Sequence, residues 1–359
     1  MTEYFENILK NFKTPTKAVI CDRFGHGHIN ETYLVVTDIG ARYILQKINE
    51  TIFKDTDILM ANVMAVTDHL RKKTTDSRRV MQLIKTLDNS PYFRHSDGSA
   101  WRMYVFVENS ICLQTPKTPE DFYESAIAFG EFQQLMKDFP AETLNETLPN
   151  FHNTRDRYRI FHEVLKKDPL GRAKEVQKEI EFALEREKEA STLVDLLDKG
   201  LLPLGVTHND TKLNNVLLDK DTRCALCVID LDTVMPGLSL YDYGDSIRFG
   251  AAVSAEDETD LDKVAMSLRL FKVYTTGYIK ACPDLTDMEI EMMPMGAKLM
   301  TLECGLRFLT DYIDGDNYFS CHRPKHNLDR CRTQFKLVWD MEQKWIEMNR
   351  IVKEIKNSI

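Results

Sequence analysis

Two glycines, Gly25 and Gly27, interrupt a run of alternating apolar and polar residues, and the alternation resumes directly after them in "FGHGHINETYLVV". Such alternation predicts β-strands with one buried face, so the glycines lie in a loop that joins two strands. A strand after the glycines excludes the Rossmann arrangement, in which a helix follows them. Glycines let backbone N–H groups approach an anion closely, but a G-x-G in a hairpin is more commonly a simple turn.

The chain divides into two parts of different character. From residue 18 to about 108 the sequence reads mostly as strands, with one helical stripe at 55–73. Beyond Asn109 the periodicity is mainly helical, as in "EDFYESAIAFGEFQQLMKDF". With 359 residues the chain is long enough for two hydrophobic cores. We therefore expect an α+β protein with two lobes: a small antiparallel-sheet lobe over 1–107 and a larger, mainly helical lobe over 108–359.

Composition narrows the class of partner. Lys and Arg total 47 against 56 Asp and Glu, a formal net charge of −9, which argues against nucleic acid or an anionic membrane as the main partner. No apolar run approaches the roughly 20 residues that span a bilayer, and the N-terminus lacks a signal-peptide pattern. We expect a cytoplasmic protein with no obligate protein partner, whose eight scattered cysteines are reduced.

Polar residues after two apolar segments near the middle of the chain carry the clearest chemical information. In "THNDTKLNNVLLDKDTRCALCVIDLD", Asn215 lies five residues after Asp210, and Asp230 ends the strand-like "CVID". In kinases a loop aspartate takes the proton of the acceptor hydroxyl, while an asparagine and a second aspartate hold magnesium on the phosphates. The spacing therefore predicts Asp210 as the catalytic base and Asn215 and Asp230 as Mg²⁺ ligands. The alternative is a turn rich in Asn and Asp whose side chains bond only to their own backbone.

These residues, "HNDTKLNN" and "VIDLD", resemble the phosphotransfer motif of the aminoglycoside phosphotransferase and choline kinase superfamily, and the similarity extends along essentially the whole chain. The resemblance implies a protein-kinase-like fold with a nucleotide-binding lobe over 1–107 and a catalytic and substrate-binding lobe over 108–359. It implies ATP and Mg²⁺ as cofactors. It also implies that Asp232 adds to a second metal site or to its bound waters.

The resemblance also assigns the nucleotide contacts. It implies that Gly25 and Gly27 belong to the nucleotide loop, and that the backbone of Phe106 and Val107, in "YVFVE", meets adenine.

One departure from the kinase pattern concerns the lysine that normally binds the α- and β-phosphates and pairs with a glutamate on the next helix. In "RYILQKIN" the matching position is Gln46, and the alternation turns Lys47 to the opposite face of the strand. The helix at 55–73 contains no glutamate at all. We therefore expect no lysine–glutamate pair, so that magnesium and the loop amides carry the phosphate charge.

Further segments, among them "GDSIRFGA" and "ECGLRFLTDYIDGDNYF", resemble the sugar kinases that phosphorylate the anomeric hydroxyl of N-acetylglucosamine or N-acetylgalactosamine. That resemblance implies an N-acetylhexosamine as the acceptor and places Glu303 and Arg307 at the sugar site. Spacing alone favours a different interpretation, an ion pair across one helical turn on a solvated surface. His28 is a third candidate for the sugar, or else an ordinary polar loop residue. Asp242 or Asp245 is expected to support the metal loop.

Two other functions remain open. A choline, homoserine or aminoglycoside kinase has the same motif, and a catalytically inactive nucleotide-binding module is consistent with the missing lysine–glutamate pair. Joint retention of Asp210, Asn215 and Asp230 favours an active enzyme.

Overall fold

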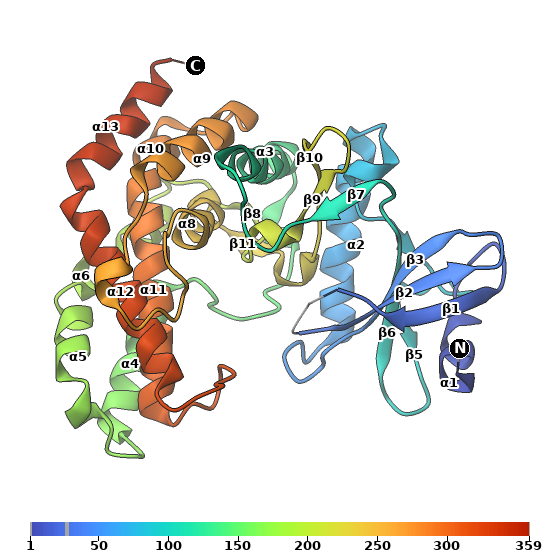
Figure 1. The fold of residues 1–359 in the computed structure, drawn as a ribbon, viewed down its shortest axis with the longest axis horizontal. Helices are drawn as coiled ribbons and strands as arrows, with labels where there is room; N and C mark the ends of the chain where they lie inside the picture. Colours follow the sequence, from blue (N-terminus) through green and yellow to red (C-terminus); the bar gives the residue numbers. More distant parts are fainter. Residues whose placement is uncertain (1, 26–28, 359) are drawn as a thin grey trace.

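The computed structural model describes residues 2–25 and 29–358 of the chain. Its first part is an antiparallel sheet, drawn at the right of Figure 1, with the strand order β1-β2-β3-β6-β4 and with β5 also paired to β6. The strands are β1 (Ala18–Arg23), β2 (Glu31–Thr37), β3 (Arg42–Lys47), β4 (Leu83–Ile84), β5 (Phe93–Arg94) and β6 (Ala100–Val105). The elements from α1 to β6 are called the sheet lobe.

A helix covers each face of this sheet. α1 (Glu3–Leu9) packs on the face that contains Leu45 and Trp101, and α2 (Thr56–Lys73) packs on the face that contains Tyr104. α2 begins where the Asp55 side chain accepts a hydrogen bond from the N–H of Ile58 at 3.0 Å, a helix N-cap. Alternate residues of each central strand therefore enter two separate cores.

Two small antiparallel sheets lie between the sheet lobe and the helices (Figure 1). One has the order β10-β9-β7, and the other pairs β11 with β8. Their bounds are β7 (Ser110–Cys112), β8 (Gly205–Thr207), β9 (Val216–Asp219), β10 (Ala225–Val228) and β11 (Met235–Gly237). Each strand has at most four residues, so these sheets serve mainly to position the loops between them.

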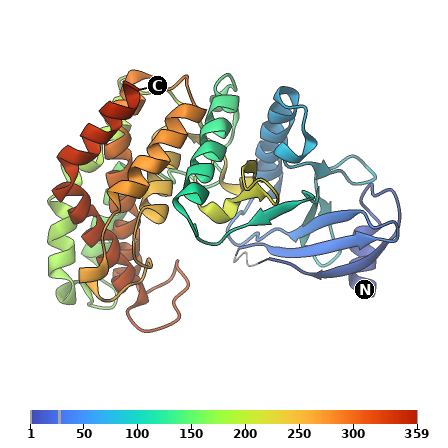
Figure 2. The ribbon, with the colours of Figure 1, turned by 45° about the horizontal axis from the view of Figure 1, so that its top comes forward.

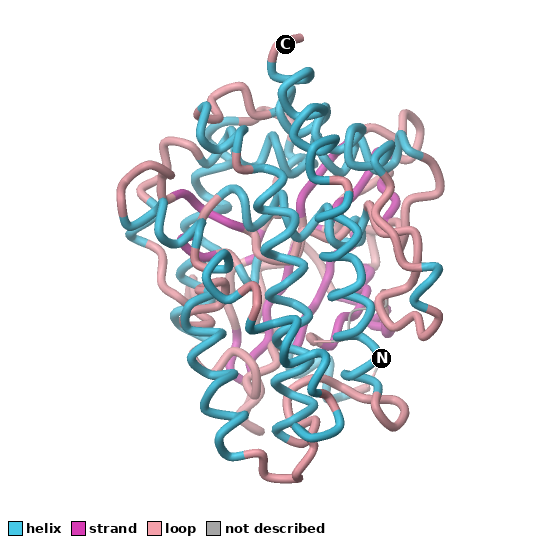
Figure 3. The backbone as a smooth tube through the Cα atoms, turned by 90° about the vertical axis from the view of Figure 1, so that its left-hand side faces the viewer, coloured by secondary structure: helices cyan, strands magenta, loops and turns pink. Residues whose placement is uncertain are grey.

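The remaining helices form the helical lobe, at the left of Figure 1; several cover the face seen in Figure 3. Figure 2 shows α3 between the other helices and the small sheets, in contact with β10. The helices are α3 (Pro119–Met136), α4 (Thr154–Lys167), α5 (Gln177–Leu184), α6 (Glu187–Ala190), α7 (Thr192–Asp198), α8 (Ser239–Gly250), α9 (Leu268–Ala281), α10 (Asp287–Glu291), α11 (Met293–Asp314), α12 (His326–Gln343) and α13 (Trp345–Lys356).

α11 is the central helix of this lobe and packs against α4, α8 and α12. Its approach to α8 is close, because a Cβ at Gly244 would lie only 2.3 Å from the carbonyl oxygen of Gly296. Any side chain at Gly244 would separate the two helices. Since α8 and α11 both carry candidate site residues, this contact helps fix the distance between those residues.

The predicted fold class is confirmed: an antiparallel sheet comes first, and a mainly helical region follows. Across the described residues, no helix combines the length and the apolar character needed to cross a bilayer. All eight cysteines lie in the described ranges and have free thiols. Of the Cys-x-x-Cys pair, Cys224 is exposed and Cys227 is buried.

Candidate active site

The loop after β8 is held in place by α8. Asp242 is fully buried; its two carboxylate oxygens accept hydrogen bonds from the backbone N–H groups of His208 and Asn209, each at 2.8 Å. The amide of Gln133 donates a third bond at 2.8 Å. Asn209 has a φ of 65°, in the left-handed region that asparagine tolerates better than most residues. These contacts fix the backbone that presents Asp210, and they give Asp242 the supporting position that the sequence predicted.

Replacing Asp242 by asparagine should destabilise the protein. The amide would present a donor to backbone N–H groups that need an acceptor, so we expect a loss of roughly 2–3 kcal/mol in the free energy of unfolding. Urea denaturation measures it. Asp287→Asn is the matched control, because that side chain is 85% exposed and should change stability by less than about 0.5 kcal/mol. Equal stabilities for the two variants would contradict the supporting role of Asp242.

The structure brings Asp210 and Asn215 together. The amide nitrogen of Asn215 donates to carboxylate Oδ2 of Asp210 at 2.9 Å and to its backbone carbonyl at 2.8 Å. The Nζ atom of Lys212 lies 2.9 Å from the other carboxylate oxygen, Oδ1. Burial lowers the pKa of Lys212, but the carboxylates of Asp210 and Asp245 outweigh burial and raise it, so the lysine is charged. Both oxygens of Asp210 are therefore held in a defined orientation.

Asp230 lies just after β10, with a φ of 61°, again in the left-handed region. Burial, together with the nearby carboxylates of Asp232 and Asp210, raises the pKa of Asp230 to about 7. Arg102 and Lys212 offset part of this effect, but three carboxylates stand against two cations, so negative charge remains in excess around Asp230. A bound cation would relieve that repulsion.

The residues present fit a magnesium site of the kinase type. Among the described residues, no three His, Cys, Asp or Glu side chains form a group that could hold a metal ion unaided. Magnesium in kinases, however, usually has only one or two protein carboxylates and completes its shell with water and substrate phosphates. The amide nitrogen of Asn215 is used for Asp210, so the amide oxygen is the atom with which it would bind the ion.

The glycine loop lies at the end of β1. Gly25 has a φ of 75°, which L-residues with a side chain rarely adopt, so the backbone requires glycine there. The two other candidates in this loop, Gly27 and His28, lie outside the described residues.

The segment after β6 lies beside that loop, because the ring of Phe106 meets the ring of Phe24 edge-on at 6.0 Å. The N–H of Phe106 donates to the carbonyl of Arg42 at 3.1 Å, and the carbonyl of Val107 accepts from the Ser110 hydroxyl at 2.7 Å. Within the described part of the chain, the carbonyl of Phe106 and the N–H of Val107 have no such partner. The carbonyl of Phe106 and the N–H of Val107 therefore provide one hydrogen-bond acceptor and one donor, next to each other along the backbone.

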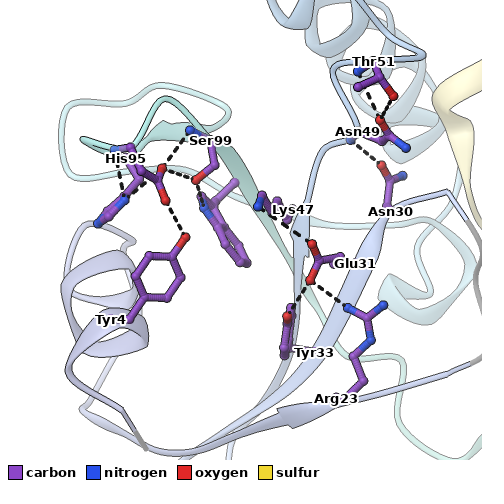
Figure 4. A network of polar contacts seen from close by, with 12 residues as sticks. Tyr4, Arg23, Asn30, Glu31, Tyr33, Lys47, Asn49, Thr51, His95 and Ser99 are labelled. Atoms are coloured by element: carbon purple, nitrogen blue, oxygen red, sulfur yellow. Dashed lines mark hydrogen bonds and ion pairs between the residues drawn. The ribbon is translucent and has the colours of Figure 1, made fainter.

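Gln46 and Lys47 lie on opposite faces of β3, as the alternation predicts. The Nζ atom of Lys47 is 3.8 Å from carboxylate oxygen Oε1 of Glu31, and both side chains are partly exposed (Figure 4). Gln46 faces the other way and donates to the hydroxyl of Thr32 at 3.1 Å. Lys47 therefore lies on the face opposite to Gln46.

Glu303 and Arg307 do not form the solvated ion pair that spacing alone favours, and that interpretation is wrong. Glu303 is only 3% exposed, and its Oε1 lies 2.7 Å from Nδ1 of His152. Burial raises the pKa of Glu303, but His152 and the nearby arginines outweigh it and lower the pKa, so the carboxylate is ionised. The Arg307 guanidinium lies 4.9 Å from the ring centre of Phe151 and 5.8 Å from that of Tyr318.

In the Glu303–His152 pair, two buried polar atoms have no hydrogen-bond partner among the described residues: Oε2 of Glu303 and Nε2 of His152. Buried polar atoms are nearly always paired, so two orphans on interacting side chains indicate a missing partner. His152 also acts on the carboxylate of Asp245. Burial raises the pKa of Asp245, but Arg248, Lys212 and His152 outweigh burial and lower it, and Lys212 is bonded to Asp210.

Three residues of this region were not predicted from the sequence: Lys212, His152 and Arg102. Lys212 lies inside the quoted motif, two residues after Asp210, and this short separation is the sequence feature that indicates a contact between them. Arg102 is a charged residue in the otherwise apolar face of "AWRMYV", which marks it as unusual for a buried strand. His152 lies in a loop 151 residues from its partner Glu303, and nothing local distinguishes it.

Comparison with known proteins identifies the family. The model of the phosphotransferase enzyme family matches residues 21–265, well over half of the chain. This chain belongs to that family.

Solved structures show the same fold at low sequence identity. An aminoglycoside phosphotransferase from Alicyclobacillus acidocaldarius is 13% identical, with 98% of this chain and 96% of that chain covered and a TM-score of 0.64. A microcompartment-associated aminopropanol kinase is 15% identical, with 96% and 98% covered and a TM-score of 0.63. An amicoumacin kinase in complex with AMP-PNP, Ca²⁺ and Ami is 14% identical, with 90% and 89% covered and a TM-score of 0.56. The phosphotransferase therefore has the bilobal fold of small-molecule kinases.

Proposed function

We propose that this phosphotransferase is an N-acetylhexosamine 1-kinase, which transfers the γ-phosphoryl group of ATP to the anomeric hydroxyl of N-acetylglucosamine or N-acetylgalactosamine. The resemblance of "ECGLRFLTDYIDGDNYF" to these sugar kinases suggests the acceptor. The observation that carries the proposal is the buried Glu303–His152 pair with its two unpartnered polar atoms. We assign the nucleotide to the lobe over 1–107 and the sugar to the lobe over 108–359.

Asp210 acts as the general base. Its carboxylate takes the proton of the attacking hydroxyl as that oxygen bonds to the γ-phosphorus and the bond to the β-phosphate oxygen breaks. Asn215 and Lys212 each hold one carboxylate oxygen, which limits the orientations available to the base. The hydroxyl must come within about 3 Å of Asp210 for direct proton transfer.

Asn215 and Asp230 would hold magnesium, which when bound neutralises the charge of the β- and γ-phosphates. The excess of negative charge around Asp230 supports this role. For adenine, the free carbonyl of Phe106 and N–H of Val107 supply one acceptor and one donor. Gly25, together with Gly27, would bring loop N–H groups near the phosphates. The amicoumacin kinase, bound to AMP-PNP and Ca²⁺, supports a nucleotide and a divalent cation in this fold.

The charged side chains around Glu303 favour a neutral, hydroxyl-rich acceptor molecule. Glu303 is accompanied by two arginines, Arg157 and Arg307, each of which acts on its pKa. Two further carboxylates, Asp311 and Asp314, line the adjoining cavity beside the two arginines, so the formal charges nearly balance and a strongly charged acceptor such as an aminoglycoside is not favoured. A sugar hydroxyl, in contrast, can donate to Oε2 of Glu303 and also accept a hydrogen bond. This cavity, of about 190 Å³, contains both arginines and both aspartates in its lining, and Tyr318 and Phe319 give it an aromatic wall.

An acceptor panel tests the proposal. Incubation with ATP, Mg²⁺ and separately N-acetylglucosamine, N-acetylgalactosamine, glucose, choline and homoserine should yield phosphate transfer to the two N-acetylated sugars. Discrimination against glucose should reach about 10²-fold or more, because a site built for a polar group is left with unpaired atoms when that group is missing. ³¹P NMR should locate the phosphate on the anomeric oxygen, and methyl glycosides blocked there should be inert.

Other outcomes would point elsewhere. Transfer to the 6-hydroxyl, or preference for choline, homoserine or an aminoglycoside, would contradict the 1-kinase proposal while leaving a small-molecule kinase. Nucleotide binding without transfer to any acceptor would favour the inactive binding module.

Glu303 allows a sharper test of the acceptor site. Glu303→Gln preserves shape but replaces one accepting oxygen with a donor, so the KM for the sugar should rise about 10-fold or more while the KM for ATP stays unchanged. Glu291→Gln on α10, an exposed residue, is the matched control and should behave as wild type. Equal changes in both KM values for Glu303→Gln would contradict its assignment to the acceptor.

A further inference from the structure

The missing lysine–glutamate pair has a structural counterpart in this chain. Gln46, which the sequence comparison with kinases matches to the lysine, lies directly opposite Arg102 of β6 in the antiparallel ladder. The Nε atom of Arg102 donates to the side-chain oxygen of Gln46 at 3.0 Å, and Gln46 in turn donates to Thr32. A lysine at position 46 would put a second cation beside Arg102. Glutamine avoids that repulsion and supplies the acceptor that orients the guanidinium.

Arg102 forms an ion pair with the loop after β10. Its side chain is only 1% exposed, and its two terminal nitrogens donate to the two carboxylate oxygens of Asp232, with Nη2 at 2.9 Å from Oδ2. Burial lowers the pKa of Arg102, but Asp232 outweighs it and raises the pKa, so the pair is ionic. Bidentate arginine–carboxylate pairs fix geometry as well as charge. All three guanidinium nitrogens therefore have partners within the protein.

The pair joins the two halves of the candidate active site. Arg102 belongs to the sheet lobe, whereas Asp232 lies two residues after Asp230 in the turn Leu231–Thr233. Asn30, just before β2, also donates to Asp232 at 2.6 Å. Asn30 itself accepts a bond from the backbone N–H of Asn49 at 3.0 Å (Figure 4). Two side chains of the sheet lobe, Arg102 and Asn30, thus bind the buried carboxylate of Asp232 and hold the loop that contains Asp230.

We propose that Arg102 is a positioning residue that replaces the lysine–glutamate pair: by binding Asp232, with Gln46 orienting it, Arg102 fixes the Asp230 loop relative to the nucleotide lobe. In the usual arrangement the lysine and glutamate both lie in the nucleotide lobe. Here the cation comes from the neighbouring strand and its anionic partner from the loop after β10. The proposal rests on the proposed kinase function of the site, and it gives Asp232 a role in holding the loop rather than in binding the metal directly.

Three variants test this role. Arg102→Lys retains the charge but loses the two-pronged contact and the bond to Gln46. Gln46→Met removes the acceptor for Nε and the bond to Thr32, and leaves the pair with Asp232 possible. Lys47→Ala is the matched control from the adjacent position, because its side chain faces the opposite side of the strand.

The first measurement needs neither nucleotide nor acceptor. In the ligand-free protein, hydrogen exchange should follow the amides of Ile229, bonded to the carbonyl of Asn215, and of Val234, bonded to that of Leu231. We expect both to exchange about 10-fold faster in Arg102→Lys, less so in Gln46→Met, and at the wild-type rate in Lys47→Ala. Unchanged exchange in Arg102→Lys would overturn the proposal.

The second measurement separates positioning from mere stabilisation. Titration calorimetry with Mg²⁺ and AMP-PNP, at a temperature well below unfolding, should give an affinity at least 10-fold weaker for Arg102→Lys and about 3-fold weaker for Gln46→Met. The sugar KM should not change. A lower melting temperature for Arg102→Lys with wild-type affinity and kcat would reduce the pair to a structural contact and overturn the proposal.

The outcomes remain interpretable if Arg102→Lys fails to fold. Gln46→Met then decides, and wild-type nucleotide affinity in that variant overturns the proposal. If the wild-type protein itself binds no nucleotide, the proposed function fails. If the wild type binds and all variants bind equally well, only the role of Arg102 fails.

Discussion

Replacing Asp230 by asparagine should reduce phosphate transfer by about 10³-fold or more. A metal that bridges phosphates contributes several kcal/mol of charge stabilisation, and each 1.36 kcal/mol corresponds to a factor of ten in rate. Asparagine is the informative substitution, because Asp230 has a φ of 61° and alanine would add backbone strain of its own. Steady-state rates over a range of Mg²⁺ concentrations measure the effect.

The same substitution should stabilise the metal-free protein. Burial and the neighbouring carboxylates raise the pKa of Asp230 from 3.8 to about 7. A raised folded-state pKa means that the neutral form contributes stability at pH values below about 4, and that this contribution is lost as the pH rises through about 7. At pH 8 the metal-free wild type therefore carries an unfavourable, partly buried charge that asparagine removes.

Thermal unfolding in EDTA at pH 8 should consequently show a higher melting temperature for Asp230→Asn than for wild type, with the difference shrinking toward pH 5. Asn215→Ala is the comparison for activity, since an amide coordinates the ion without neutralising it and should cost less. An Asp230→Asn enzyme with unchanged dependence on Mg²⁺ would contradict the metal assignment. A lower melting temperature at pH 8 would contradict the charge argument alone.

The sequence predicts those parts of the site that lie close together along the chain. Asp210 and Asn215 are five residues apart, so their spacing carries the geometry, and the alternation in β3 correctly turns Gln46 and Lys47 to opposite faces. The two-lobe fold follows similarly, because strand and helix periodicity are local properties.

Contacts between distant residues could not be predicted in this way. Arg102 and Asp232 are 130 residues apart, and His152 and Glu303 are 151 apart. Which residues meet in these two pairs depends on how β6 faces the turn after β10 and on how the loop before α4 packs on α11. Local sequence patterns do not encode either arrangement. Glu303 illustrates the consequence: a spacing of four to Arg307 favours an exposed pair, whereas packing buries the glutamate against a histidine.

Asp210→Asn should lower kcat by roughly 10²–10⁴-fold, the range of general-base catalysis, while leaving the affinity for Mg²⁺ and AMP-PNP close to that of wild type. The amide retains the shape of the carboxylate but cannot take a proton, and Asp210 is outside the pair of residues proposed to hold the metal. Quench-flow measurement of the transfer step, together with calorimetry, separates the two quantities. Asp221→Asn, an exposed aspartate in the turn between β9 and β10, is the matched control and should retain the wild-type rate.

Comparing Asp210→Asn with Asp230→Asn distinguishes a catalytic base from a metal ligand. A base variant binds the nucleotide and fails at transfer, whereas a metal-ligand variant loses both. If Asp210→Asn lost nucleotide affinity as severely as Asp230→Asn, Asp210 would belong with the metal ligands and another group would have to accept the proton. Lys212 could not be that group, because its raised pKa keeps it protonated at neutral pH. Near-wild-type turnover in Asp210→Asn would instead mean that the acceptor hydroxyl loses its proton without a base from this loop, as a dissociative phosphoryl transfer permits.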